Sequence, residues 1–85
     1  MIVLELAFDG HPARLAARPA HRRRLTQLRE KGVLVMAGPW ADDTGALLMF
    51  DAERSEVDAI MAEDPYYTTE GVRVTSLRDW RPIVR

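Results

Sequence analysis

Residues Gly32–Phe50 read GVLVMAGPWADDTGALLMF, and this stretch decides how the chain folds. Apolar residues fill Val33–Trp40 and Ala46–Phe50, as is typical of buried β-strands. Between the two runs stands ADDTG, whose aspartates and glycine suit a turn. The stretch therefore predicts a hairpin formed by two consecutive strands.

A helix is predicted immediately before the hairpin, over Pro19–Gly32. Proline is favourable at the first position of a helix, and glycine commonly follows the last. His21, Leu25 and Leu28 recur at helical spacing on one side, while mainly charged residues take the other side. The preceding residues Ala13–Arg18 are compatible with either an irregular segment or a helical turn.

A second, shorter helix is predicted after the hairpin, over Glu56–Glu63. Ser55 and Asp58 stand three residues apart, which resembles a capping box at the helix start, and Pro65 ends the helix. The positions that face inward at helical spacing are Val57, Ile60, Met61 and Asp64. The helix therefore directs one carboxylate, that of Asp64, toward the interior.

Two further strands are predicted near the ends of the chain. Ile2–Phe8 is apolar, begins with two β-branched residues and has Glu5 as its only charge. Val72–Trp80 alternates at first, and its pattern slips near Ser76, which indicates a bulge. The order β-α-β-β-α-β predicts a ferredoxin-like α+β fold, with two helices on one face of a four-stranded antiparallel sheet. We expect one domain spanning residues 1–85.

The two hairpin strands also indicate a partner for the sheet. Both are apolar at consecutive positions, so both faces of the sheet should be buried, but the helices cover only one. The simplest way to bury the other face is to pack it against the sheet of a second copy of the chain. We therefore expect a homodimer through the sheet face; a stripe of isolated exposed hydrophobic residues is the alternative.

The charge of the chain limits which other classes of partner we expect. The 85 residues include 12 basic and 13 acidic side chains and carry a net charge of -1. No global field therefore attracts nucleic acid or an anionic membrane. The run Arg22-Arg23-Arg24 is the local exception, and a solvated helix face explains it better than a phosphate clamp, because no aromatic or glycine-rich partner accompanies it. We expect neither a nucleic acid nor a membrane as partner.

Residue types exclude several chemistries. The absence of cysteine removes disulfides, thiolate catalysis and cysteine-based zinc sites, and it fits a reducing cytoplasm. Two histidines on separate elements, with no dense group of carboxylates, make a transition-metal site unexpected. The opening MIVLELAF lacks a basic leader and is too short to span a bilayer, so we interpret it as a strand. We expect a cytoplasmic protein without a metal.

The polar residues converge on one edge of the predicted sheet. Right-handed crossovers bring the start of the first helix and the end of the second to this edge. The residues gathered there are Asp9, Gly10, His11, Arg18, His21, Gly38, Pro39, Trp40, Asp42, Asp43, Asp64, Pro65 and Tyr66. His21 and Asp64 both lie on inward stripes, so they could meet. A carboxylate that fixes the imidazole tautomer makes histidine a usable general base.

Structural interpretations of the same residues remain open. An inward histidine is often a satisfied core residue, and Asp64 could accept backbone hydrogen bonds as an Asx-turn. Asp42 and Asp43 are more often turn formers than catalytic acids. Trp40 and Trp80 are better explained as core or dimer-interface anchors than as a platform for bases.

The sequence resembles the YciI-like family, also described as the YCII-related domain. The matching stretches are RPAHRRRLTQLREKGVLVMAGP, DDTGALLMF and AEDPYYTTEGV, which with the final strand cover nearly the whole chain. The combination of R-x-x-H, a strand ending in A-G-P and a later D-P-aromatic step is more specific than any one piece. Where many relatives have Gly-Ser, this chain has Gly45-Ala46 and lacks the serine hydroxyl as a contact for a substrate.

The resemblance implies a dimeric fold of the α/β-barrel type, with a histidine and an aspartate proposed as a catalytic dyad in a cleft. These two residues correspond to His21 and Asp64. Arg18, Gly38 and Pro39 match other motif positions. A few relatives are linked to dehydrochlorination or related steps on aromatic-ring degradation products, without a cofactor.

Two functional hypotheses follow. The first is a cofactor-free lyase or isomerase for a small anionic metabolite, with His21 as general base and Asp64 orienting it. Arg18 would hold an anionic group, while Gly38, Pro39 and Tyr66 would shape the binding site. Under this hypothesis we expect a raised pKa for His21. The second is a dimeric domain that binds a small molecule without turnover, and fold alone cannot choose between them.

Overall fold

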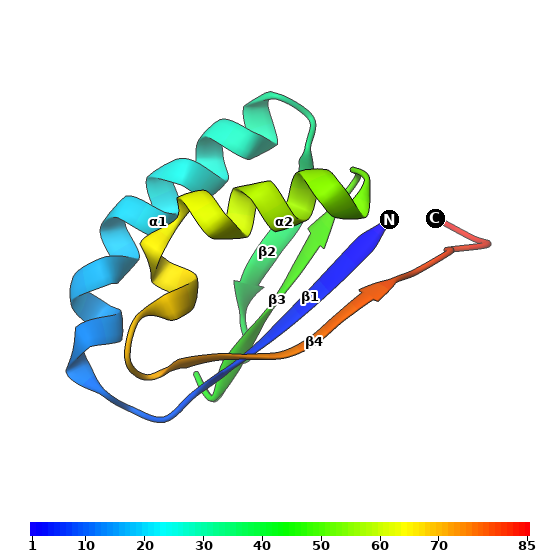
Figure 1. The fold of residues 1–85 in the computed structure, drawn as a ribbon. Coiled ribbons are helices and arrows are strands. Elements are labelled where there is room, and N and C mark those ends of the chain that lie inside the picture. The colour runs from blue at the N-terminus through cyan, green and yellow to red at the C-terminus, as the bar shows by residue number, and fades with distance from the viewer.

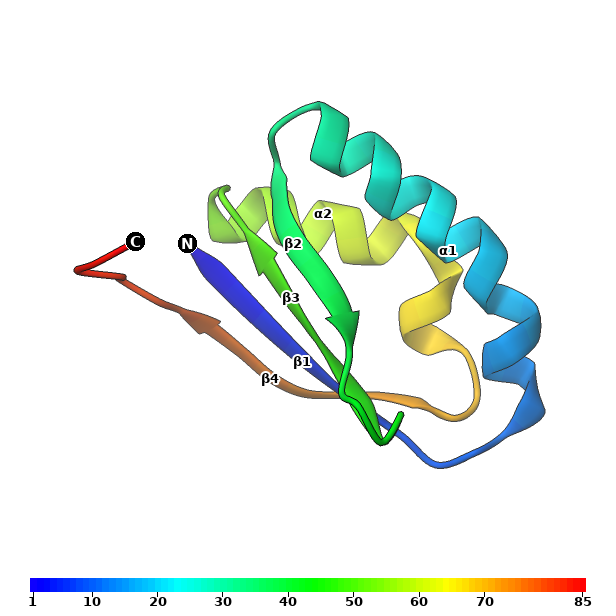
Figure 2. The ribbon, with the colours of Figure 1, turned by 180° about the vertical axis from the view of Figure 1, so that it is seen from behind.

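The computed structural model describes residues 1–85 and has the predicted order of elements. The bounds are β1 Ile2–Phe8, α1 Pro12–Glu30, β2 Leu34–Pro39, β3 Gly45–Phe50, α2 Arg54–Glu63, a 3₁₀-helix η1 Pro65–Thr68 and β4 Val72–Asp79. Both helices cover one face of the sheet (Figure 1), and the view from behind shows the other face without a helix (Figure 2). The ferredoxin-like α+β fold is confirmed.

The sheet is antiparallel throughout, with the strand order β2-β3-β1-β4. The predicted bulge lies in β4, where Ser76 pairs with Glu5 and Val74 pairs with Leu6. Thr75 is the additional residue, and its hydroxyl donates a hydrogen bond to the Glu5 carbonyl at 3.2 Å. The two edge strands are therefore β2 and β4.

The predicted start of the first helix is wrong. Helix α1 begins at Pro12, so Ala13–Arg18 is helical and Pro19 lies inside the helix. His11 is the N-cap, and its Nδ1 accepts a hydrogen bond from the Ala13 amide at 3.0 Å. Pro12 therefore takes the early helical position that the sequence interpretation gave to Pro19, where a missing amide hydrogen costs nothing.

The predicted capping box of the second helix is also wrong. Helix α2 begins at Arg54 after the N-cap Glu53, and no side chain caps it. Asp58 instead accepts a hydrogen bond from Arg54 Nε at 3.1 Å, one turn away on the exposed surface. An arginine four residues earlier competes successfully for the carboxylate that a capping box would need.

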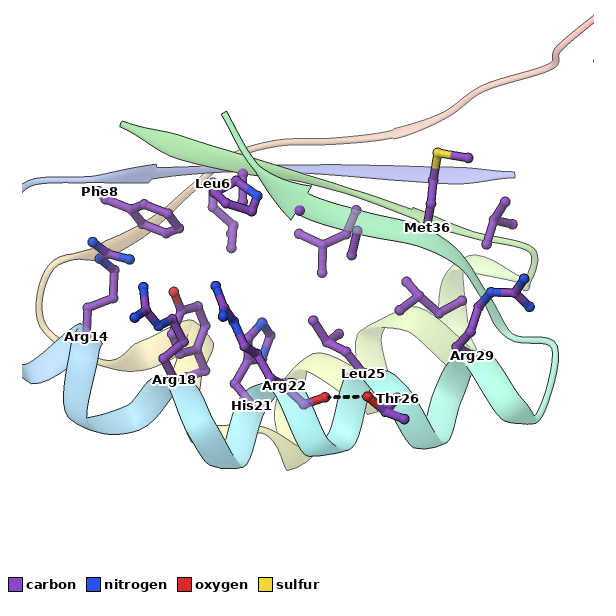
Figure 3. A pocket seen from close by; sticks show the side chains of 18 of the residues that line it. Leu6, Phe8, Arg14, Arg18, His21, Arg22, Leu25, Thr26, Arg29 and Met36 are labelled. Carbon is purple, nitrogen blue, oxygen red and sulfur yellow. Dashed lines mark hydrogen bonds between the residues drawn. The ribbon is translucent and has the colours of Figure 1, made fainter. Parts of the chain in front are cut away.

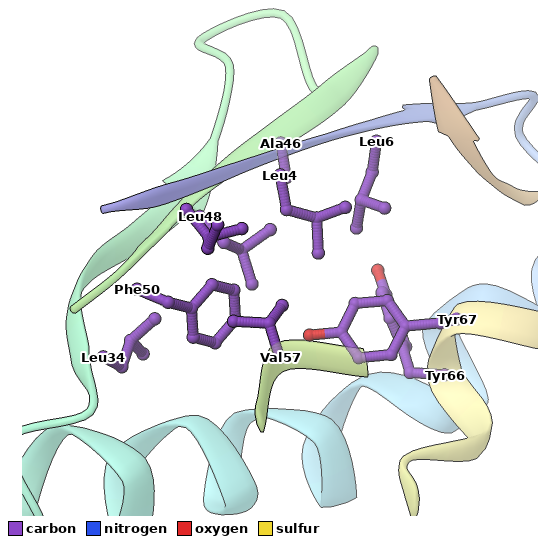
Figure 4. Close-up of a cluster of buried hydrophobic side chains, with 10 residues drawn as sticks. Leu4, Leu6, Leu34, Ala46, Leu48, Phe50, Val57, Tyr66 and Tyr67 are labelled. Carbon is purple, nitrogen blue, oxygen red and sulfur yellow. The ribbon is translucent and has the colours of Figure 1, made fainter. Parts of the chain in front are cut away.

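The core lies between the sheet and the two helices (Figure 4). Along β1, Ile2, Leu4 and Leu6 are buried while the residues between them are partly exposed. The residues that complete the core are Leu34, Ala46, Leu48, Phe50, Val57, Tyr66 and Tyr67. Neither helix combines the length and the apolar character needed to cross a membrane.

The two tryptophans do not belong to this core. Trp40 is 44% exposed and Trp80 is 46% exposed. The interpretation of these residues as core anchors is therefore wrong, because each follows the end of an edge strand, beyond the cover of the helices. Their role as dimer-interface anchors stays a prediction.

Candidate active site

His21 and Asp64 meet beneath the sheet edge where the two helices converge. Nδ1 of His21 lies 2.7 Å from Oδ2 of Asp64, although 43 positions separate them in the chain. His21 is on α1 and Asp64 is the residue between α2 and η1. Both residues are buried, at 6% and 5% exposure. A carboxylate can only accept, so Nδ1 carries the shared proton and neutral His21 keeps Nε2 as an acceptor.

Asp64 has a second, structural contact. Its Oδ1 accepts a hydrogen bond from the Tyr66 amide at 3.0 Å and thereby caps η1, which begins at Pro65. The Asx-turn expected as an alternative is thus present together with the histidine contact. One carboxylate oxygen caps the start of η1, and the other orients His21.

Aromatic rings enclose the imidazole. Tyr66 stacks on His21 with ring centroids 3.9 Å apart and an angle of 8° between the planes. Tyr67 meets it edge-on at 5.3 Å. Burial raises the pKa of Tyr67, and the nearby Asp64 charge adds to this, so its hydroxyl stays protonated at neutral pH. The rings limit the rotation of His21 and hold it in the plane that faces Asp64.

The pKa of His21 is lowered from 6.5, mainly because burial disfavours the imidazolium ion. The Asp64 hydrogen bond and charge oppose this effect, while the charges of Arg22 and Arg24 add to it. The expected raised pKa is therefore wrong. Desolvation outweighs the carboxylate, so His21 is neutral and able to accept a proton at neutral pH.

A cavity of about 550 Å³ extends between α1 and the strands, and His21 lies in its wall (Figure 3). Arginines on α1 line one side, and apolar residues of the sheet line the other. Four arginines face two acidic residues in this lining. The cavity is therefore suited to a ligand that carries negative charge.

Three of the arginines stand four residues apart on one face of α1. Arg14 is buried, its Nη2 donates to Asp43 Oδ2 at 3.0 Å, and its guanidinium lies 4.2 Å from the centre of the Phe8 ring. Burial lowers the pKa of Arg14, but Tyr66 and Asp43 outweigh this and raise it. Arg18 and Arg22 make no hydrogen bond or ion pair with another side chain. These two cations are free to bind an anion.

The structure brings the sequence-predicted residues together around this cavity. Arg18, His21, Gly38, Pro39 and Tyr66 line it, and Asp64 contacts His21 from behind. Gly38 and Pro39 belong to the exposed edge strand β2 and form part of the wall opposite α1.

Three charged residues near the His21 end of the lining were given no binding role by the sequence interpretation, although it placed Asp43 at this edge of the sheet. Arg14 and Asp43 form an ion pair at one end, and Arg22 lines the cavity although its run was interpreted as a solvated face. The signal for Arg14 and Arg22 was their spacing of four residues on either side of Arg18. Asp43 had no comparable signal. Its φ angle of 59° lies in the left-handed region of a turn, where aspartate is common, so the residue type indicates the turn and not the ion pair.

Other polar residues of the same edge lie apart from His21. His11 pairs with Glu70 at 2.9 Å, and Asp9 accepts a hydrogen bond from the His11 amide. Asp42 accepts two hydrogen bonds from Thr44 within the hairpin turn. No group of three or more His, Cys, Asp or Glu side chains is placed to hold a metal ion.

Comparison with protein families gives a match over most of the chain. The family model for the YCII-related domain matches residues 2–81, from the start of β1 to beyond the end of β4. No curated protein matches the chain.

Proposed function

This chain belongs to the YCII-related domain family, and from the geometry of its cavity we propose that it is an enzyme that moves a proton on a small organic anion. His21 is the general base and Asp64 is its positioning residue. The reaction class is that of a lyase or an isomerase acting at a carbon next to a carboxylate or a similar acidifying group, without a cofactor.

The observation that carries this proposal is the 2.7 Å contact between His21 Nδ1 and Asp64 Oδ2 in the wall of a cavity. Asp64 fixes the tautomer, so the basic lone pair is on Nε2. When Nε2 takes a proton, the carboxylate stabilises the imidazolium that forms. General-base catalysis of this kind typically contributes about 10² to 10⁴ in rate.

The arginines supply the electrostatic part of the mechanism. Arg18 and Arg22 flank His21 on α1, so a substrate carboxylate that binds them places its neighbouring carbon near the imidazole. Negative charge that develops when the proton leaves is stabilised by the same cations. The proton on His21 then returns to another carbon in an isomerase, or assists the departure of a leaving group in a lyase.

Deuterium exchange tests this proposal across many candidate substrates at once. A panel of small carboxylic acids is incubated with the protein in D₂O, and NMR detects replacement of hydrogen at carbon. We expect exchange in at least one acid with the native protein, and a loss of about 100-fold or more in His21→Asn. Arg18→Gln should also reduce exchange, because it removes a cation that binds the substrate carboxylate. Arg23→Gln is its matched control, because Arg23 is exposed on the same helix and does not line the cavity.

Two outcomes would contradict the proposed mechanism. Exchange that persists in His21→Asn would exclude His21 as the base. Binding of an acid without any exchange would favour the alternative function, a domain that binds a small molecule without turnover.

We also propose that two copies pair through the sheet face opposite the helices. Met36 pairs with Met49 across the β2–β3 ladder, so both side chains lie on one face, and Leu47 lies on that face two residues from Met49. Met36 is 62% exposed, and its side chain extends from β2 on the side opposite α1 (Figure 3). An apolar face of this kind on a central strand is typical of an interface.

Sedimentation velocity tests the dimer. Leu47→Arg places a charge at the centre of the sheet face, and we expect it to convert a dimer to a monomer. Ser55→Arg, at an exposed position of α2, is the control and should leave the mass unchanged. A native protein that sediments as a monomer at micromolar concentration would contradict this proposal.

A further inference from the structure

The cavity extends well beyond the residues that the proposed chemistry uses. It follows α1 from Arg14 past His21 to Arg29 and Glu30. The step from His21 to Arg29 alone corresponds to about 12 Å of helix, at about 1.5 Å per residue. Its volume of about 550 Å³ lies in the range of about 300–1,000 Å³ found for cavities that enclose drug-sized ligands. A compact acid at Arg18 and His21 would leave most of this space unfilled.

The middle of the cavity is apolar on both sides. Leu25 lies one turn beyond His21 on α1, and the sheet contributes Leu34, Leu48 and Ala46. The register pairs Ala37 with Leu48, so the small side chain of Ala37 also lies on this inner face. The methyl groups of the two alanines occupy little space, which leaves a groove between α1 and the strands.

The one hydroxyl in this part of the lining is already engaged. Thr26 donates its hydroxyl hydrogen to the Arg22 carbonyl of its own helix at 3.1 Å (Figure 3). The middle of the groove therefore offers few polar groups to a ligand, and a ligand segment placed there gains mainly by leaving water.

The two ends of the groove differ in charge. At the His21 end, Arg18 and Arg22 lack anionic partners, whereas at the far end Arg29 is accompanied by Glu30. A second anionic group would therefore find no net positive charge at the far end. The lining fits a ligand with one anionic end.

We infer that the ligand class is a monocarboxylic acid with an elongated apolar body. The carboxylate binds Arg18 and Arg22, and the apolar body lies along Leu25 toward the far end of the groove. The position of the carboxylate beside His21 rests on the proposed function, whereas the apolar groove rests on the lining alone.

Titration calorimetry with unbranched acids from butanoate to octanoate tests this inference on the full chain. Each added methylene that enters the groove should tighten binding about threefold to fourfold. The same dependence on length should be nearly absent in Leu25→Gln. Leu28→Gln is the matched control, since Leu28 packs against the core from the same helix and does not line the cavity.

Leu25 packs against the core, so a second variant tests the groove at a position outside the core. Ala37→Gln changes an exposed residue of β2 and should weaken octanoate about tenfold while leaving butanoate unchanged. Octanol should bind at least tenfold more weakly than octanoate, and octanedioate should bind more weakly than octanoate.

Several results would overturn the inference. They are a dissociation constant that does not change with chain length, a length dependence that survives in both Leu25→Gln and Ala37→Gln, and tighter binding of the alcohol or the diacid. Failure of the proposed function looks different: the length dependence would hold, which supports this inference, while no acid exchanges hydrogen in D₂O.

Discussion

The chain has two histidines, and each contacts a carboxylate in a different region of the fold. His21 and Asp64 lie 2.7 Å apart with side chains 7% and 6% exposed, whereas His11 and Glu70 lie 2.9 Å apart with side chains 44% and 79% exposed. The pairs are similar in chemistry and distance. Burial distinguishes them, because it changes both the energy of the charged states and access to a ligand.

The backbone contacts of the two regions differ as well. Asp64 uses its second oxygen to cap η1, so the carboxylate is held from two sides. His11 uses its second nitrogen to cap α1, so there the histidine, and not the acid, is the structurally engaged partner. The comparison predicts that the carboxylate of the buried pair and the imidazole of the exposed pair make the larger contributions to the stability of the fold.

The largest expected effect is on stability when each carboxylate is removed. Asp64→Ala leaves a buried polar ring without its partner and removes a cap, so we expect a loss of about 3 kcal/mol in the free energy of unfolding. Glu70→Ala should change it by no more than about 0.5 kcal/mol. Urea denaturation of both variants measures the difference, and equal losses would remove burial as the distinction.

The second largest expected effect is the dependence of stability on pH. Burial lowers the pKa of His21 in the folded state below 6.5, so folding disfavours its protonation. The stability contribution is therefore complete above pH 6.5 and is lost as the pH falls through the folded-state pKa. Denaturation at a series of pH values should show this loss in the native protein and not in His21→Asn.

Loss of the exposed imidazole should have a smaller effect. His11→Ala removes the cap of α1 and should cost about 1 kcal/mol, within the range for helix N-caps. His11→Asn keeps a side-chain acceptor at the cap and should retain most of this energy. If His11→Asn is as unstable as His11→Ala, the contact with Glu70 matters more than the cap.

The smallest effect concerns the surroundings of the buried pair. Arg22→Gln removes a positive charge that disfavours the imidazolium ion, so the pKa of His21 should rise. Arg23→Gln is the control on the same turn of α1 and should leave it nearly unchanged. NMR titration of the His21 ring measures both, and a pKa that does not respond to Arg22→Gln would contradict a contribution of the Arg22 charge.

Much of the fold followed from local patterns. The apolar runs and turn residues of the hairpin gave two strands at nearly the observed bounds, and the slip near Ser76 marked the bulge at Thr75. Helix starts were predicted less well. A histidine acts as the N-cap of α1, and an exposed arginine engages the acid of the expected capping box in α2, neither of which residue type alone indicates.

The candidate site was predictable to the extent that it depends on helical spacing. Inward positions on two helices placed His21 and Asp64 near one edge, and the structure puts them in contact. Arg22 was misjudged, because three successive arginines point in three directions around a helix and only one of them lines the cavity. Asp43 depends on a turn conformation that brings it to Arg14 across the fold.

The sequence pattern accounts for the order of the elements, the inward direction of His21 and Asp64, and the end of α2 before Pro65. These features depend on spacing and backbone chemistry within a few residues. Three features depend on the packed fold: the lowered pKa of His21, the pairing of Arg14 with Asp43, and the apolar groove beside Leu25. Desolvation and cavity shape depend on which distant residues pack together, and that information is not local in the chain.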